Sequence, residues 1–154
     1  MAKEIERKFL VKGDSWRSQG HGRRYRQGYL STVKERTVRV RTAGDRGFIT
    51  VKGINVGPTR AEYEYEIPLA DANEMLDHLC ERPLIEKTRY RILSGDVVWE
   101  VDEFDGVNRG LITAEVELKS EDQTVSLPDW IGQEVSDDPR YYNANLVARP
   151  FSAW

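Results

Sequence analysis

The sequence predicts a mainly β fold of the α+β type, in which eight antiparallel strands close into a tunnel barrel with a charged interior and a few flanking helices. Short segments whose side chains alternate in character every two residues follow one another along the chain. Turn-forming stretches rich in Gly, Asp, Asn or Pro separate these segments. Strands joined in order by short turns form an antiparallel meander, and eight of them are enough to close a barrel.

The expected strands belong to a single domain, residues 1–154. A chain of 154 residues is long enough for one domain with a real core and too short for two comfortable ones. The strands are expected at residues 3–11, 23–31, 35–42, 46–53, 58–67, 86–93, 96–104 and 110–119.

A first helix is expected after the fifth strand, in the stretch DANEMLDHLC. Asp71 is its candidate cap, and Glu74 follows three residues later, as in a capping box. Its apolar positions form one stripe: Met75, Leu76, Leu79 and Cys80. The stripe predicts that Cys80 packs against the barrel and that His78 lies on the surface.

A second helix is expected near the end of the chain, in the stretch DPRYYNANLVARP. Asp138 is its candidate cap, Pro139 stands at the first helical position, and Pro150 follows the expected end. We interpret the remaining stretches as turns, among them AGDRG, GINVGP, SGD and DGVNRG.

The composition excludes several classes of protein. The net charge of −3 gives no general reason to expect a nucleic-acid or membrane partner, so any electrostatic function must depend on local patches. A single cysteine excludes an internal disulfide, and two histidines are too few for a histidine-based metal site. No apolar run approaches the roughly 18 residues that cross a bilayer, and the charged start does not resemble a signal peptide. We therefore expect a cytoplasmic protein.

One face of the first expected strand carries only charge. At a two-residue period, the stretch EIERKFLV places Glu4, Glu6 and Lys8 on one face, and its apolar residues lie on the other, interrupted by Arg7. Seven of the eight expected strands share such a charged face. Its nine acids are Glu4, Glu6, Glu62, Glu64, Glu66, Glu100, Asp102, Glu115 and Glu117. Its nine bases are Lys8, Arg39, Arg41, Lys52, Arg60, Lys87, Arg89, Arg91 and Lys119.

The arrangement of these charges indicates a binding site. For a single strand, the ordinary interpretation is a solvated outer face with weak ion pairs between strands. In the whole set, however, like charges lie two residues apart, roughly 7 Å along a strand, and whole strands carry mainly one sign. Such neighbours cost stability unless something multivalent offsets them. Carboxylate clusters suit divalent cations, and Arg and Lys clusters suit phosphate, so the face fits a metal–polyphosphate complex.

If the charged face points into the barrel, the apolar face points outward. It would then pack against the two helices and, as one option, against a partner subunit. Confining so many charges is costly unless ligands or water accompany them, so we expect a wet, charged tunnel.

At these residues the sequence resembles the CYTH superfamily, the triphosphate tunnel metalloenzymes. The N-terminal ExExK pattern of that family stands here as Glu4-Ile-Glu6-Arg-Lys8. The further matching elements, in order, are QGYL at 27–30, RVR at 39–41, TVK at 50–52, RAEYE at 60–64, EKTRY at 86–90, EVD at 100–102, EVE at 115–117 and DPRYYNANL at 138–146. The resemblance spans nearly the whole chain.

The resemblance implies a barrel that holds a linear triphosphate and Mg²⁺ or Mn²⁺. The implied metal ligands are Glu4, Glu6, Glu62, Glu64, Asp102, Glu115 and Glu117. The implied phosphate-binding residues are Lys8, Arg39, Arg41, Lys52, Lys87 and Arg89. Glu4, Glu6 and Lys8 are also expected to take part in catalysis, as is Tyr29, whose phenol either hydrogen-bonds the substrate or only lines the tunnel. Rim or supporting positions are expected for Arg60, Glu66, Arg91, Glu100 and Lys119.

The resemblance also implies an activity. The stretch MAKEIERKFLV is similar to that of the short bacterial members of the family, which favour inorganic tripolyphosphate. We therefore expect metal-dependent hydrolysis of tripolyphosphate to pyrophosphate and phosphate. Thiamine-triphosphatase activity, adenylate cyclase activity and a non-catalytic module that binds polyphosphate or nucleotide are the alternatives. A small-molecule triphosphate is the expected partner, with no nucleic acid and no membrane, and a homodimer stays open.

Overall fold

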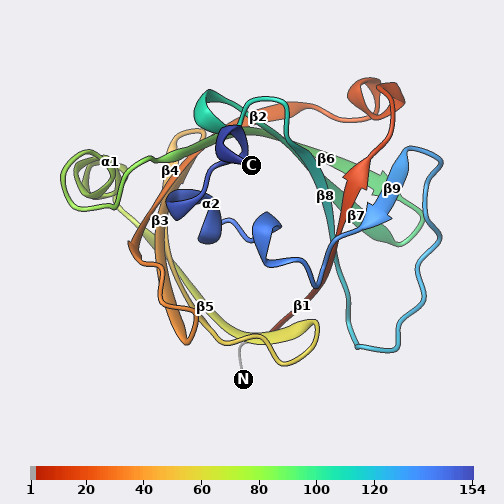
Figure 1. Cartoon of the computed structure of the whole chain (residues 1–154), viewed down its shortest axis with the longest axis horizontal. Helices are drawn as coiled ribbons and strands as arrows, with labels where there is room; N and C mark the ends of the chain where they lie inside the picture. Colours follow the sequence, from red (N-terminus) through yellow and green to blue (C-terminus); the bar gives the residue numbers. More distant parts are fainter. Residues whose placement is uncertain (1–2) are drawn as a thin grey trace.

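The computed structural model describes residues 3–154, and its eight long strands close into an antiparallel barrel, as predicted. The strands of the barrel are β1 (Lys3–Val11), β2 (Gly22–Ser31), β3 (Arg36–Ala43), β4 (Arg46–Gly53), β5 (Thr59–Ile67), β6 (Ile85–Ser94), β7 (Val97–Phe104) and β8 (Ile112–Glu117). Around the ring they follow the order β1-β5-β4-β3-β2-β6-β7-β8 and return to β1. Seen along its axis, the barrel forms an open ring (Figure 1).

A short antiparallel seam between β1 and β5 closes the ring. Lys3 pairs with Ala61, Glu4 with Arg60, and Ile5 with Thr59. Beyond this seam, the second half of β1 pairs with β8 on one edge. On the other edge it pairs with a short strand that the sequence analysis did not predict, β9 (Ile131–Glu134). The strand β9 lies outside the ring (Figure 1).

The charged face points into the barrel and the apolar face points outward, as predicted. A large apolar cluster therefore lies outside the ring, over β1 and β6 to β8. It contains Trp99 and Val101 of β7, together with Trp16 of the 3-10 helix Ser15–Ser18, all without solvent exposure. Trp130, which precedes β9, packs edge-on against Trp99. The loops therefore cover this part of the outer surface.

The first helix, α1 (Leu69–His78), covers the outer face of β3 and β4 (Figure 1). Gly47 of β4 allows the helix to approach the sheet closely, because it has no side chain. A Cβ added at Gly47 would lie only 2.7 Å from the Cβ of Ala72. Cys80 is buried there, as predicted, and His78 is exposed, as predicted. The prediction that Leu79 belongs to the buried stripe is wrong, because its side chain is 66% exposed.

The predicted cap of α1 is also wrong. The helix begins after Pro68, whose side chain cannot accept a hydrogen bond, and Asp71 lies inside its first turn. A carboxylate in the first turn still interacts favourably with the positive end of the helix dipole.

The second predicted helix is divided into two short elements. Asp138 does cap, since its carboxylate accepts a hydrogen bond from the backbone N–H of Arg140, but the element is a single 3-10 turn, Pro139–Tyr141. One turn of α-helix follows as α2 (Asn145–Ala148), and a further 3-10 turn, Phe151–Ala153, comes after Pro150. Tyr142, which follows the first turn, has an extended backbone conformation, so a continuous helix does not form.

This C-terminal segment, residues 135–154, lies across the lumen of the ring (Figure 1). The buried side chains of its residues Val135, Tyr141, Leu146 and Val147 pack with Tyr29, Ile85 and Phe104 of the barrel interior and with Leu111. One end of the tunnel is therefore filled by an apolar core, while the charged part of the interior stays open to a cavity.

Within the described residues, no helix has the length and the apolar character that crossing a membrane requires.

Candidate functional site

The charged interior of the barrel surrounds a cavity of about 940 Å³. Most of the site residues expected from the sequence line it: Glu4, Glu6, Lys8, Tyr29, Arg39, Arg41, Lys52, Glu62, Glu64, Arg89, Glu115 and Glu117. The two that do not line the cavity, Lys87 and Asp102, are completely buried behind its wall. Of the residues expected at the rim, Arg60 and Glu100 line the cavity as well.

The order of the strands around the ring separates the two kinds of charge. The neighbouring strands β7, β8, β1 and β5 supply the inward-facing carboxylates, and most of the bases come from β4, β3 and β6. The strand β2 lies between β3 and β6 and contributes Tyr25 and Tyr29. We call the carboxylates of β7, β8, β1 and β5 the acidic arc, and the bases of β4, β3 and β6 the basic arc. A ligand in the lumen would thus have carboxylates on one side and cations on the other.

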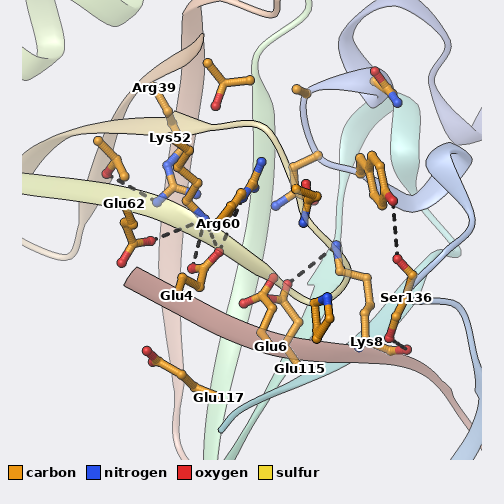
Figure 2. Close-up of a pocket in the computed structure, with 18 of the residues that line it drawn as sticks. Glu4, Glu6, Lys8, Arg39, Lys52, Arg60, Glu62, Glu115, Glu117 and Ser136 are labelled. Atoms are coloured by element: carbon orange, nitrogen blue, oxygen red, sulfur yellow. Dashed lines mark hydrogen bonds and ion pairs between the residues drawn. The ribbon is translucent and has the colours of Figure 1, made fainter. Parts of the chain in front are cut away.

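The two arcs meet at Lys52 of β4. Its ammonium donates hydrogen bonds to both carboxylate oxygens of Glu4, at 2.9 and 3.0 Å, and forms an ion pair with Glu62 at 3.3 Å (Figure 2). Arg60 lies opposite Glu4 in the seam and approaches it to 3.5 Å. Three carboxylate oxygens therefore converge on one positively charged nitrogen.

The cation does not fully neutralise this pair of carboxylates. Burial raises the pKa of Glu4, but the charge and hydrogen bonds of Lys52 outweigh it and lower this pKa to about 2. Burial and the neighbouring Glu4 raise the pKa of Glu62 to about 7. One positive charge thus supports one of the two carboxylates, and a divalent cation would support both.

Glu6 and Glu117 form a second acidic pair. They lie directly opposite each other on β1 and β8, and within residues 3–154 neither makes an ion pair. Burial, together with the charges of Glu115 and Glu4, raises the pKa of Glu6 well above its ordinary value. Burial and Glu4 also raise the pKa of Glu117. Ionising both carboxyls is therefore costly here, and a divalent cation would stabilise their charged forms.

Asp102 holds two bases of the basic arc in place. One of its carboxylate oxygens accepts a hydrogen bond from Arg89 Nε at 2.7 Å, and the other accepts from Arg89 Nη2 at 2.8 Å and Lys87 Nζ at 2.9 Å. Burial opposes the charge on Arg89, but Asp102 outweighs it and raises the pKa of the guanidinium. Burial lowers the pKa of Lys87 to about 8 although Asp102 opposes this change. Both oxygens of Asp102 are thus bound to bases and do not reach the cavity.

The opposite wall of the basic arc contains Arg39 and Arg41 of β3. Arg41 forms an ion pair with Glu64 at 3.1 Å, and Arg39 lies 4.0 Å from the same carboxylate. The guanidinium of Arg41 also lies over the ring of Tyr25, 5.2 Å from its centre. The Nε atoms of both arginines are buried and have no hydrogen-bond partner among the described residues. The wall therefore has donors available for an anionic ligand.

The C-terminal segment contributes to the site, which the sequence analysis did not predict. Lys8 Nζ donates to the backbone carbonyl of Tyr141 at 2.9 Å. It also lies 3.7 Å from Glu115 (Figure 2). Ser136 accepts a hydrogen bond from the backbone N–H of Lys8 and lines the cavity with Tyr142. The similarity of DPRYYNANL to the family was the only sequence signal that this segment takes part in function, and it did not indicate a position inside the barrel.

Tyr29 lines the cavity and also packs in the apolar core beneath the C-terminal segment. It is only 5% exposed. Its side chain therefore lies at the boundary between the charged cavity and this core.

The donor set fits a divalent metal. Across residues 3–154, no three His, Cys, Asp or Glu side chains are gathered into a ready-made cage. The reason is visible in the ion pairs: Lys52 lies between Glu4 and Glu62, and Arg41 holds Glu64. The carboxylate oxygens around Lys52 nevertheless converge on one cationic centre, and oxygen donors are those that Mg²⁺ and Mn²⁺ prefer.

The chain is similar to known proteins over nearly its whole length. The family model of the CYTH domain matches residues 2–150. An inorganic triphosphatase of Acetivibrio thermocellus is 54% identical over 151 residues, which cover 98% of this chain and 97% of that protein. An inorganic triphosphatase of Nitrosomonas europaea is 40% identical over 148 residues, which cover 94% of this chain and 96% of that protein. The crystal structure of the inorganic triphosphatase NE1496 superposes with a TM-score of 0.66 at 36% identity, covering 96% of this chain and 95% of that one.

Proposed function

Because this chain belongs to the CYTH family, we propose that it is an inorganic triphosphatase, which hydrolyses tripolyphosphate to pyrophosphate and phosphate inside the barrel. The observation that carries the proposal is the cavity with carboxylates along one side and Arg and Lys along the other. Phosphate groups fit the basic arc and a divalent metal fits the acidic arc. Relatives of the same length that bear this activity in their names support the choice of substrate.

The proposed roles follow from the position of each side chain. Arg39 and Arg41 bind phosphate oxygens from one wall, and Arg89 binds them from the other. Lys8, fixed by the Tyr141 carbonyl, supplies a point charge at the end nearest the C-terminal segment. The chain of phosphates is thereby stretched along the lumen, which aligns the terminal phosphorus and its leaving oxygen for in-line attack.

The acidic arc would hold the metal and orient the attacking water. CYTH triphosphatases are metal-dependent, and we propose Mg²⁺ or Mn²⁺, with Glu4, Glu6, Glu62, Glu64, Glu115 and Glu117 as the residues that hold it. When bound, the metal would neutralise developing charge on the phosphate oxygens and lower the pKa of a coordinated water. For Asp102 we now propose a positioning role, because Lys87 and Arg89 take both of its oxygens.

The test is phosphate release from tripolyphosphate, ATP, thiamine triphosphate and pyrophosphate, measured with Mg²⁺ or Mn²⁺ and with EDTA. We expect metal-dependent release that is fastest from tripolyphosphate. Faster release from thiamine triphosphate, or cyclic AMP formation from ATP, would favour the corresponding alternative. Binding of tripolyphosphate without release from any substrate would indicate a binding module.

The variant Glu6→Gln tests the site itself. It removes one charge from the acidic arc, and we expect metal-dependent turnover to be lost while the circular dichroism spectrum is retained. Glu74→Gln is the matched control, because Glu74 is an exposed residue of α1, outside the barrel. Wild-type activity in Glu6→Gln would remove this residue from the proposed site.

The cytoplasmic location and the homodimer stay predictions. Size-exclusion chromatography with light scattering would decide the oligomeric state.

A further inference from the structure

Lys52 lies where the acidic arc and the basic arc meet, and its contacts assign it a function beyond phosphate binding. Its ammonium lies 2.9 and 3.0 Å from the two oxygens of Glu4 and 3.3 Å from an oxygen of Glu62 (Figure 2). Lys52 is only 9% exposed and Glu4 only 8%, so solvent screens these contacts weakly. Among residues 3–154, only Lys52 forms ion pairs with both carboxylates, and Arg60 approaches Glu4 alone, at 3.5 Å.

A divalent metal would need the same oxygen atoms. Metal–oxygen bonds to Mg²⁺ are about 2.0–2.1 Å long and require near-octahedral geometry, so the ion would lie among the oxygens that now surround Lys52 Nζ. Two cations on the same three oxygens would repel each other strongly in this weakly screened position. Lys52 and the metal therefore exclude each other at Glu4 and Glu62.

The displaced ammonium could turn toward the basic arc, on the strand next to its own. Lys52 belongs to β4, beside β3, and lies directly opposite Thr37, two residues before Arg39. A lysine is a point charge on a flexible four-carbon stem, so it can turn from the carboxylates toward a phosphate beside Arg39. A metal that arrives alone leaves Lys52 without a partner, whereas a metal–triphosphate complex supplies it with one.

We infer that Lys52 is an exchangeable counter-ion, which holds the metal-binding carboxylates until the substrate arrives and then transfers its charge to a phosphate oxygen. The inference rests on the proposed function. It makes the binding of metal and of triphosphate cooperative, because each ligand binds more tightly when the other is present. It also gives Lys52 opposite effects on the two ligands, since it opposes the metal alone and supports the triphosphate.

The experiment measures Mn²⁺ binding by electron paramagnetic resonance of the free ion at pH 8, with and without a non-hydrolysable imido analogue of tripolyphosphate. For Lys52→Met we expect Mn²⁺ alone to bind about tenfold more tightly than to the wild type, because the variant lacks one charged hydrogen-bond partner that competes for the carboxylates. We expect the same variant to bind the Mn²⁺–analogue complex more weakly. The increase in Mn²⁺ affinity caused by the analogue should accordingly shrink.

Lys34→Met is the matched control. Lys34 lines the same cavity and makes no ion pair within residues 3–154, so the variant removes an equal charge without touching Glu4 or Glu62. If Lys34→Met raised the Mn²⁺ affinity as much as Lys52→Met, the effect would be one of general charge and the inference would fail. Lys52→Gln, which keeps a hydrogen-bond donor, is the second variant if Lys52→Met does not fold, and thermal melts with and without Mn²⁺ report folding.

Equal or weaker Mn²⁺ binding by folded Lys52→Met or Lys52→Gln would overturn the inference. Its failure is distinct from that of the proposed function. If Glu4→Gln left Mn²⁺ binding unchanged, both the proposed metal site and the proposed exchange of Lys52 for the metal would be overturned. Phosphate release by the wild type that persists in EDTA would overturn the metal-dependent function, whatever the binding of Mn²⁺.

Discussion

Asp102 gives the sharpest test of how the basic arc is built. Its carboxylate has no solvent exposure and is shared between Lys87 and Arg89 at 2.7–2.9 Å. The variant Asp102→Asn keeps the shape of the side chain but removes the charge that both bases share. Removing one partner of a buried ion pair costs about 3–5 kcal/mol, because it leaves an uncompensated charge. We expect the free energy of unfolding to fall by about that amount.

The loss of Asp102 should also change the two bases. The pKa of Lys87 is already about 8 because of its burial. Without the carboxylate this pKa should fall further, so a larger fraction of Lys87 would be neutral at a given pH. Arg89 would be free to turn toward Glu100 or Glu115, which lie 3.4 and 4.0 Å from it. A misplaced Arg89 alone would cost one charged hydrogen bond to phosphate, about 1.5–3 kcal/mol or roughly 10- to 150-fold in kcat/KM.

The assay is phosphate release from tripolyphosphate at rising metal concentration, together with urea denaturation. If Asp102 positions the bases, the loss of activity should persist at saturating metal. Full recovery of activity at high metal would refute this reasoning and restore Asp102 as a metal ligand. Asp77→Asn is the control, because Asp77 forms an exposed ion pair with Arg26 at 3.2 Å, and such pairs contribute only about 0–1 kcal/mol.

Two further predictions concern stability. The pKa of Glu62 is raised from 4.5 to about 7, so the folded protein holds a proton that the unfolded chain loses, and its stability should fall as pH rises through that window. Urea denaturation at pH 4.5 and 7.5 should show this decrease, and Glu62→Gln should reduce it; an unchanged decrease would rule out Glu62 as its source. Leu146→Ala should cost about 2–5 kcal/mol, since Leu146 is completely buried in the core that closes one end of the tunnel. A thermal melt against Leu93→Ala, whose side chain is 75% exposed, measures this, and equal effects would contradict the packing described.

The sequence by itself determined the strands and the direction of the charged face. Side chains alternate strictly along a strand, so the position of Glu4, Glu6 and Lys8 on one face follows from the spacing alone. A barrel built from seven strands with this pattern either encloses the charged faces or exposes all of them to solvent. The unusual runs of like charge favoured the first alternative, a charged tunnel. The local signals at chain ends and turns were weaker. The α1 cap was misplaced at Asp71 and β9 was not predicted, because four residues carry too little periodicity.

Only the tertiary structure decided which charges meet. Glu4 and Lys52 are far apart in the chain, and the β1–β5 seam brings their strands together with β4 at the border of the two arcs. The sequence could not reveal that Asp102 faces two bases, because its pairing with Lys87 and Arg89 depends on the register between β6 and β7. Nor could it place the C-terminal segment inside the barrel, where buried side chains of the segment, Leu146 among them, pack with the interior. Alternation fixes the face of a residue, and strand order and register fix its partners.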